Sequence, residues 1–234
     1  MPEPDRAAAD PQAVELLNEL SHCLRRVVII SGRDTDFLVS RLQVTGALFI
    51  GNHGLEERDS GASRVVDEAQ PYLGRLRRAA DAVEALAQAQ APHIVIERKR
   101  ATVSIHFRTA ADPSASRAAL QPALEEIARG ENLQLQPGRL VWELRPPLEL
   151  DKGEVLRRLA AKLQPAGIIY VGDDRTDADA FSALKRMPCV STGAVGVRST
   201  EVPDDVFVDC DLMVDGVPGV TQFLRQLLDI CSAA

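Results

Sequence analysis

Short runs of purely apolar residues alternate along this chain with stretches in which apolar residues recur every three or four positions. Residues 11–26 show this helical spacing, and the apolar run Val27–Ile30 directly after them predicts a buried strand. A second helix and a second strand are predicted over 34–42 and 47–50. Runs that are apolar throughout are typical of parallel strands buried on both faces, so this part of the chain predicts α/β layers.

The middle of the chain predicts a different, antiparallel layout. An Ala- and Arg-rich stretch at 63–89 predicts a long helix, and the alternating segments 93–97 and 102–108 predict a hairpin joined by a charged turn. A further helix and a second pair of strands are expected at 112–128, 133–135 and 139–145.

The last part of the chain returns to the first pattern. Predicted elements are helix 154–163, strand 168–171, helix 176–186, short apolar runs near Cys189 and Phe207, and a terminal helix at 217–231. We therefore expect an α/β fold with a doubly wound parallel core sheet, formed by residues 1–58 and 148–234. An α+β domain at 59–147 is expected to interrupt this core.

The composition is that of a globular protein, since 45% of the 234 residues are hydrophobic. A formal net charge of −7 argues against nucleic-acid binding, and no apolar run approaches the roughly 18 residues needed to span a bilayer. Met1–Arg6 holds no secretory apolar segment, and the four cysteines lack a C-x-x-C spacing, so we interpret them as reduced and structural. We expect a cytoplasmic enzyme that is monomeric and binds neither nucleic acid nor membrane.

The strongest chemical signal follows the predicted strand 168–171. This apolar strand runs directly into Asp173–Asp177, which holds three carboxylates and a threonine. Hard divalent cations prefer oxygen ligands, and an open parallel sheet binds ligands beyond the carboxyl ends of its strands. The segment therefore predicts a magnesium site. The alternative is an acidic loop that caps the helix beginning near Thr176.

Polar groups suited to phosphoryl transfer occur at two further places. Ser31 follows the strand 27–30, and Lys152 lies where a helix is predicted to begin. A doubly wound sheet brings such strand ends to one edge, so these residues are expected to lie near Asp173.

With these motifs the chain resembles the haloacid dehalogenase superfamily of phosphatases and, within it, the trehalose-6-phosphate phosphatase family. The resemblance covers nearly the whole chain, and its motifs occur in order. They are Ser31–Arg33, Gly51–Glu56, Glu97–Lys99, His106–Arg108, Glu143–Pro146, Asp151–Gly153 and Gly172–Asp177.

The resemblance implies hydrolysis of trehalose 6-phosphate, a small-molecule substrate, through an aspartyl-phosphate with Mg²⁺ as cofactor. It implies that Asp173 is the metal ligand and that Asp174 and Asp177 orient it. It also implies that Lys152 pairs with the phosphoryl oxygens and that Ser31 hydrogen-bonds one of them. The alternatives are a surface lysine at a helix start and a serine in a simple turn or helix cap.

The resemblance also makes the middle domain a cap that closes over the sugar. A disaccharide offers hydroxyl groups, so carboxylates, amides and imidazoles are the expected partners. Cap positions Glu97, Lys99 and Glu143 would bind substrate, and His106 and Arg108 would join them unless they form only a solvated face of a strand. In the core, the substrate-binding residues implied are Arg33, Asn52, His53 and Glu56.

One motif of the superfamily is absent where it belongs. Its members begin with a buried strand ending in Asp-x-Asp-Gly-Thr, which supplies the nucleophile, whereas Pro2–Arg6 and the helix after it resemble the portion just beyond. Asp34–Asp36 and Asp209–Asp211 carry a similar spacing, but we interpret both as cap and turn residues. We expect the first core strand to be missing, with neighbours left unpaired around an apolar gap and the chain nearly inactive.

Two explanations for this absence remain open. Either the true start lies upstream, which we favour, or the chain binds a sugar phosphate without cleaving it. A separate alternative concerns the substrate: the chain could be a related phosphatase acting on another phosphorylated sugar, such as a glucosylglycerate or mannosylglycerate phosphate.

Overall fold

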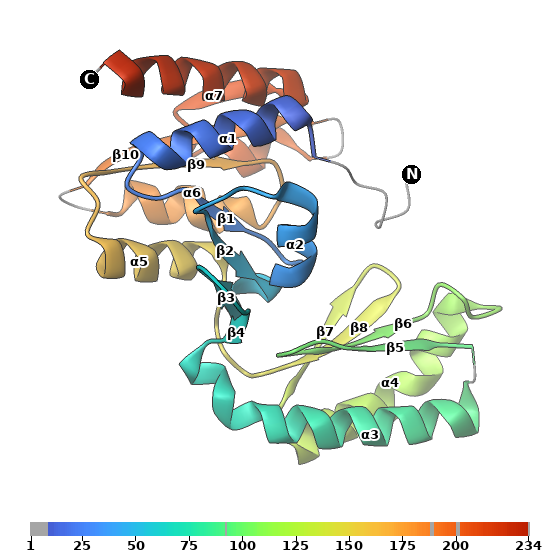
Figure 1. The fold of residues 1–234 in the computed structure, drawn as a ribbon. Coiled ribbons are helices and arrows are strands. Elements are labelled where there is room, and N and C mark those ends of the chain that lie inside the picture. The colour runs from blue at the N-terminus through green and yellow to red at the C-terminus, as the bar shows by residue number, and fades with distance from the viewer. Residues whose placement is uncertain (1–8, 92, 188–189, 200–201, 234) are drawn as a thin grey trace. The chain divides into compact units, whose positions relative to one another are not determined.

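A computed structural model describes residues 9–91, 93–187, 190–199 and 202–233 (Figure 1). Cys189 and the Pro2–Arg6 segment lie outside the described residues. The chain divides into two compact units. The first unit comprises Met1–Ser63 and Leu150–Ala234, and the second unit comprises Arg64–Glu149.

The first unit contains two small sheets. In one, β1 (Val28–Ile30) pairs in parallel with β2 (Leu48–Gly51), and β3 (Glu56–Arg58) lies antiparallel on the other side of β2. In the other, β9 (Gly167–Gly172), β10 (Ser191–Arg198) and β11 (Leu212–Asp215) are all parallel, in the order β11-β10-β9. The expected parallel α/β core is therefore confirmed, with its strands in two sheets.

Helices cover both sides of these strands. They are α1 (Pro11–Cys23), α2 (Thr35–Leu42), α5 (Lys152–Leu163), α6 (Asp177–Lys185) and α7 (Gly216–Ala233). Helices α1 and α7 pack together on one side of the β9–β11 sheet, and α5 and α6 lie on the other (Figure 1). The buried side chains Leu20, Phe49 and Leu224 join α1 and α7 to β2, while Tyr170 and Phe181 join β9 to α6. The doubly wound arrangement predicted from the sequence is thus present.

The second unit is an antiparallel sheet packed against two helices. Its strands follow the order β5 (Val95–Arg98), β6 (Val103–His106), β8 (Val141–Arg145) and β7 (Gln134–Gly138). One face carries apolar side chains that pack on α3 (Leu73–Gln90) and α4 (Pro113–Gly130). Short segments β4 (Arg64–Val65) and η3 (Asp67–Tyr72) precede α3.

Several boundaries differ from the sequence-based expectation, and three of them change the interpretation. The long helix begins at Leu73 instead of Ser63, because Pro71 lacks an N–H and restricts the residue before it, which leaves a 3₁₀ turn there. Strand β6 ends at His106, so Arg108 lies in a turn beyond the strand predicted over 102–108. The apolar run near Phe207 is a 3₁₀ turn, η4 (Asp204–Phe207), and the neighbouring strands are β10 and β11.

Candidate functional site

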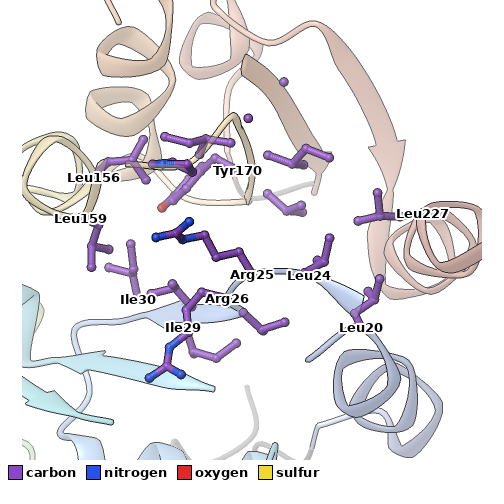
Figure 2. Close-up of a pocket in the computed structure, with 18 of the residues that line it drawn as sticks. Leu20, Leu24, Arg25, Arg26, Ile29, Ile30, Leu156, Leu159, Tyr170 and Leu227 are labelled. Atoms are coloured by element: carbon purple, nitrogen blue, oxygen red, sulfur yellow. The ribbon is translucent and has the colours of Figure 1, made fainter. Parts of the chain in front are cut away.

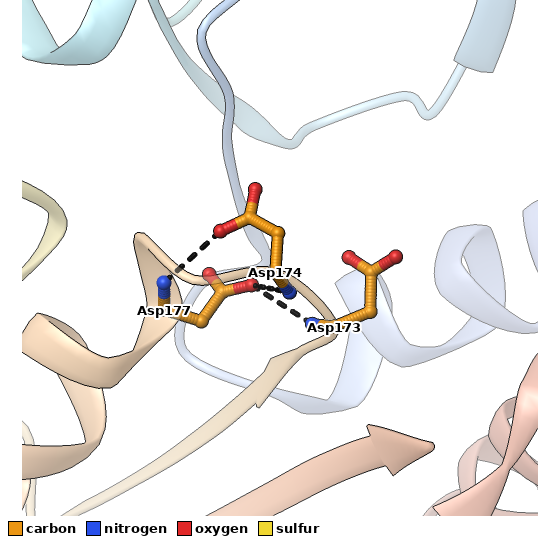
Figure 3. A group of neighbouring side chains, drawn as sticks. All are labelled: Asp173, Asp174 and Asp177. Atoms are coloured by element: carbon orange, nitrogen blue, oxygen red, sulfur yellow. Dashed lines mark hydrogen bonds between the residues drawn. The ribbon is translucent and has the colours of Figure 1, made fainter. Parts of the chain in front are cut away.

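The acidic loop after β9 is organised around the carboxylate of Asp177. Its Oδ2 accepts hydrogen bonds from the backbone N–H groups of Asp173 and Asp174, both at 2.8 Å (Figure 3). Gly172 permits this close approach, since a Cβ there would lie 2.4 Å from Cγ of Asp177. The glycine at the strand end is therefore required for the loop to fold over a buried carboxylate.

The second oxygen of Asp177 is used by two other elements. Nζ of Lys152, at the start of α5, and Oη of Tyr170, in β9, both donate to Oδ1 at 2.6 Å. Asp177 is 2% exposed and Lys152 is 9% exposed, so this ion pair is shielded from water. Asp151 fixes the start of α5 by accepting a hydrogen bond from the backbone N–H of Glu154 at 2.7 Å.

Asp174 is held in a similar way. Its Oδ1 accepts hydrogen bonds from the N–H and the hydroxyl of Thr176, at 2.7 and 2.6 Å, and Nζ of Lys152 donates to its Oδ2 at 3.1 Å. Burial acts to raise the pKa of Asp174, but the Thr176 hydrogen bonds and the Lys152 charge outweigh it, and the pKa is lowered. Asp174 is thus kept ionised.

Asp173 differs from its two neighbours. Within the described part of the chain its carboxylate is hydrogen-bonded to its own backbone and to no other residue, and its pKa is raised by burial first and then by the charges of Asp177 and Asp174. The three aspartates each have an oxygen within 4.8 Å of the others. A cation brought to this loop would relieve the repulsion, and Asp173 has the carboxylate left to bind it.

This donor set fits a hard divalent cation, because all its ligand atoms are carboxylate oxygens. Both oxygens of Asp177 are already occupied by Lys152, Tyr170 and backbone groups. Asp177 therefore shapes the loop, and Asp173 is the residue placed to hold a metal. Tyr170, which no sequence motif singled out, belongs to the site through its bond to Asp177.

The Ser31 loop carries the next predicted residues. The backbone N–H of Ser31 donates to the carbonyl of Ile50 at 2.9 Å, which continues the β1–β2 pairing. Its Oγ accepts a hydrogen bond from the N–H of Arg33 at 3.2 Å, so the hydroxyl hydrogen is available to an acceptor. The guanidinium of Arg33 lies 4.9 Å from the ring centre of Phe37.

The segment after β2 forms a tight turn, with positive φ at Asn52 and His53 (53° and 56°). Asn52 and Glu56 are both 0% exposed, and Nδ2 of Asn52 donates to Oε1 of Glu56 at 3.2 Å. The hydroxyl of Thr35, a residue that no sequence pattern indicated, donates to Oε2 of Glu56 at 3.2 Å. Substrate binding by Asn52 and Glu56 stays a prediction; their observed contacts hold the turn together.

The Ser31 and Asp173 loops lie at the same end of the first unit. The ring of His53 lies against Gly32, where a Cβ would be 2.5 Å from its Cε1. In the same turn, a Cβ on Gly54 would be 2.6 Å from Cγ2 of Val155, in the first turn of α5. Because Lys152 begins that helix, α5 connects the two loops. The structure thus brings the predicted core residues to one edge of the strands.

The second unit gathers polar side chains on the sheet face opposite its helices. Glu97, Ser104, Glu143 and Gln136 are paired across the four strands and so lie in one row. Oε1 of Glu143 accepts hydrogen bonds from Ser104, Thr102 and Lys99 at 3.2, 3.1 and 3.3 Å.

The other two residues predicted in this unit, His106 and Arg108, lie in different places. Nε2 of His106 lies 3.0 Å from Oε2 of Glu97, so this pair joins Lys99 and Glu143 on the polar face. Arg108 is exposed in the turn after β6 and is not part of that strand row. Thr102 and Ser104 were missed because short hydroxyl side chains in a strand carry no distinctive pattern.

Sequence comparisons give three informative matches. A family model described as trehalose-phosphatase matches residues 1–208. The chain is 33% identical over 210 residues to a trehalose-phosphate phosphatase of Mycobacterium leprae (strain TN), covering 85% of this chain and 48% of that protein. It is also 33% identical over 196 residues to an uncharacterized glycosyl hydrolase of Mycobacterium tuberculosis (strain CDC 1551 / Oshkosh), covering 75% and 14%. The chain thus spans half or less of these two relatives.

Solved structures agree on the fold. A trehalose-6-phosphate phosphatase related protein is similar with a TM-score of 0.74 and 22% identity, covering 98% of this chain and 92% of that chain. A haloacid dehalogenase-like hydrolase from Bacteroides thetaiotaomicron is similar with a TM-score of 0.60 and 16% identity, covering 93% and 92%. In the part of the chain that the structure describes, no helix is long and apolar enough to cross a bilayer.

Proposed function

This chain belongs to the trehalose-phosphatase family, and we propose that its function is the hydrolysis of trehalose 6-phosphate to trehalose and phosphate with Mg²⁺ as cofactor. The observation that supports this best is the loop after β9. There a shielded lysine is held by Asp174 and Asp177, while the Asp173 carboxylate bonds to no other residue among those described. A cationic group beside a metal ligand is the arrangement that binding a phosphoryl group requires.

The side chains of the first unit would have separate roles in phosphoryl transfer. Lys152 would neutralise a phosphoryl oxygen, and the free hydroxyl hydrogen of Ser31 would be donated to another. Asp173 would hold the cation, with Asp174 and Asp177 fixing the loop. When bound, Mg²⁺ supplies Lewis-acid stabilisation of the negative charge on the transferring group.

At the strand ends that carry Ser31 and Asp173, no described residue supplies the nucleophile. Oδ1 of Asp34 accepts a hydrogen bond from the N–H of Phe37 at 2.8 Å and caps α2. Oδ2 of Asp211 accepts one from the N–H of Ala194, also at 2.8 Å. Asp34 thus caps α2, and the Asp211 carboxylate is bonded to β10. We infer that the attacking carboxylate comes from outside the described residues.

The second unit would recognise the sugar. Its polar face offers the Glu143 carboxylate, Lys99 and the Glu97–His106 pair, all groups that bind hydroxyls. We propose that residues 64–149 form the cap domain of the enzyme. A monomeric state and a cytoplasmic location remain predictions, which light scattering and cell fractionation would test.

Phosphate release from trehalose 6-phosphate with Mg²⁺ tests the proposal. The parent chain is compared with Asp173→Asn and with the control Asp229→Asn, an exposed aspartate in α7. Release that is lost only in Asp173→Asn would support hydrolysis by this chain. Faster release from glucosylglycerate or mannosylglycerate phosphate would contradict the substrate assignment.

A second candidate function is sugar-phosphate binding without cleavage. It is favoured by the engagement of the Asp34 carboxylate in the cap of α2 and of the Asp211 carboxylate in a hydrogen bond to β10. Calorimetric titration with trehalose 6-phosphate separates the two. Binding without phosphate release would identify a binding protein, and absence of both would refute the proposed function for this chain.

A further inference from the structure

Helices α1 and α7 pack against each other along one apolar stripe of each helix (Figure 1). The stripe positions recur at alternating intervals of three and four residues, the spacing that keeps one face of a helix toward a partner helix. They are Ala13, Leu16, Leu20 and Cys23 in α1, and Val220, Leu224, Leu227 and Cys231 in α7. All of these except Cys23 belong to a single hydrophobic cluster. The last position of each stripe is therefore a cysteine.

The two helices run in the same direction, which brings these last positions together. Figure 1 shows the carboxyl ends of α1 and α7 on the same side of the first unit. About one turn before those ends, Leu20 of α1 lies beside Leu227 of α7 (Figure 2). Both leucines line a cavity of about 890 Å³ between β1 and β9, and the two cysteines, which do not line it, lie beyond them along the helices. The stripes thus place Cys23 opposite Cys231.

The two thiols are in direct contact. The thiol of Cys231 is hydrogen-bonded to Cys23, and burial, followed by this bond and the charge of Cys23, raises the pKa of Cys231. The thiol of Cys23 also donates to the carbonyl of Leu20, at a sulfur–oxygen distance of 3.5 Å. Both cysteines are free in this structure, with Cys23 exposed and Cys231 half-buried. Since the sulfur atoms are already within hydrogen-bonding range, a short movement of the side chains would bring them to the S–S bond length of about 2.05 Å.

Packing alone does not account for this pair. A half-buried cysteine such as Cys231 serves well as a small hydrophobe, but Cys23 is exposed and lies outside the cluster. Metal binding is not favoured either, because within the described ranges the only cluster of three or more possible ligands is Asp173, Asp174 and Asp177. An accessible thiol beside a second, less accessible one is instead the arrangement of a redox-sensitive pair.

We propose that Cys23 and Cys231 form a reversible disulfide that clamps α1 to α7 when a hydroperoxide is present. The exposed Cys23 sulfur attacks one peroxide oxygen, the O–O bond breaks, and Cys23 becomes a sulfenic acid while the rest of the peroxide leaves as an alcohol or water. The Cys231 sulfur then attacks the Cys23 sulfur, and the sulfenic oxygen leaves as water with the Cys231 proton. The two thiols lose two hydrogen atoms, and one hydroperoxide is reduced. A small thiol reductant reverses the reaction, and none of these steps depends on the proposed phosphatase function.

The crosslink would stabilise the first unit because of where its two ends lie in the chain. Cys23 is the last residue of α1, and Cys231 lies in the last turn of α7. Nearly all of the described chain lies between them, so the disulfide would close a long loop. Closing a long loop removes conformational freedom from the unfolded chain. We expect the oxidised chain to unfold at a Tm that is higher by roughly 5–15 °C.

Peptide mapping after treatment with equimolar hydrogen peroxide tests the disulfide directly. Trypsin places Cys23 in the peptide 7–25 and Cys231 in the peptide 226–234, and mass spectrometry without reductant should show the two joined, less two hydrogen atoms. The oxidised chain should have lost two of its four thiols and should remain a single chain on a non-reducing gel. Dithiothreitol should restore both thiols and the original Tm. The crosslink should form more slowly in urea, where the helices no longer hold the two thiols together.

Three serine variants assign the role of each thiol. In Cys231→Ser the sulfenic acid on Cys23 has no thiol to react with, so its labelling by dimedone should be about tenfold stronger than in the parent chain. Cys23→Ser should show neither the dimedone label in the peptide 7–25 nor the crosslink. Cys210→Ser is the matched control, because Cys210 is a half-buried free cysteine outside both helices. It should keep the crosslink and the rise in Tm.

Several outcomes would overturn the inference. These are oxidation of Cys23 without the crosslink to Cys231, a crosslink that requires Cys210, or a crosslink that forms equally fast in folded and urea-unfolded chain. Disulfide-linked dimers in place of the internal crosslink would show that Cys23 reacts between chains. Equal dimedone labelling of the parent and Cys231→Ser would exclude Cys231 as the resolving thiol. A complete crosslink that leaves Tm unchanged would refute its action as a clamp.

Discussion

Replacing Lys152 with methionine should destabilise the first unit by an amount that its contacts define. The substitution keeps the apolar stem but removes the cation that bonds to Asp177 at 2.6 Å and to Asp174 at 3.1 Å. Asp177 is 2% exposed, so water cannot readily replace the lost partner. Removing one member of a buried ion pair typically costs about 3–5 kcal/mol.

The remaining contacts place the effect at the lower end of that range. Asp177 would keep the Tyr170 hydroxyl and two backbone N–H groups, so three of its four hydrogen bonds survive. We therefore expect a loss of about 3 kcal/mol in the free energy of unfolding. For a chain of this size, that loss would lower Tm by roughly 6–12 °C.

The assay is urea and thermal denaturation followed by circular dichroism, with Lys162→Met as the control. Lys162 lies on the same helix, but its side chain is 58% exposed and its distance to Glu57 is 3.7 Å, so less than about 1 kcal/mol should be lost. If the two variants are equally stable, Lys152 is not coupled to the buried carboxylate as inferred. An intact Lys152→Met fold should also bind trehalose 6-phosphate more weakly in a calorimetric titration.

Further measurements would test other parts of the structure. Asp173→Asn should weaken Mg²⁺ binding in a calorimetric titration while leaving Tm within about 2 °C of the parent, because its carboxylate bonds to no other described residue; a large fall in Tm would contradict this. Gly172→Ala should cost about 1–3 kcal/mol in denaturation, since the added Cβ would lie 2.4 Å from Asp177, whereas Gly130→Ala, with nothing within 4 Å, should not. Glu143→Gln should weaken the binding of trehalose 6-phosphate in a calorimetric titration, with exposed Glu126→Gln as its control; an unchanged affinity would exclude Glu143 from substrate binding. Burial, followed by Asp211 and Asp209, raises the pKa of Cys210 to about 11, so at pH 8 iodoacetamide should modify exposed Cys23 first, as mass spectrometry would show.

Helices and buried strands with a strong period were predictable from the sequence. The helical spacing of apolar residues identified α1, the unbroken apolar run after it identified β1, and the acidic run after β9 marked the strand end. Strand β10 was not predicted, because its residues 191–194 are small or polar and give neither a helical nor an alternating pattern. The start of α3 was missed since Ala- and Arg-rich spacing continues across Pro71, which breaks the helix locally.

The candidate site was predictable as a set of residues but not as a set of roles. Asp173, Asp174 and Asp177 are adjacent in the sequence and look equivalent there. Their difference comes from Lys152 and Tyr170, which approach from α5 and β9 and occupy one oxygen of Asp177. In the same way, only the folded turn shows that Asn52 and Glu56 bond to each other and are hidden from solvent.

The sequence by itself determined the layer pattern, the acidic strand end and the residues that could serve phosphoryl transfer, because these depend on local periodicity and on residue type. The tertiary structure alone decided which carboxylate remains available for a cation and which polar groups are satisfied internally. It also decided the size and lining of the cavity between β1 and β9. Those properties depend on which groups distant in the chain come within hydrogen-bonding or packing distance, and short-range sequence patterns do not specify such distances.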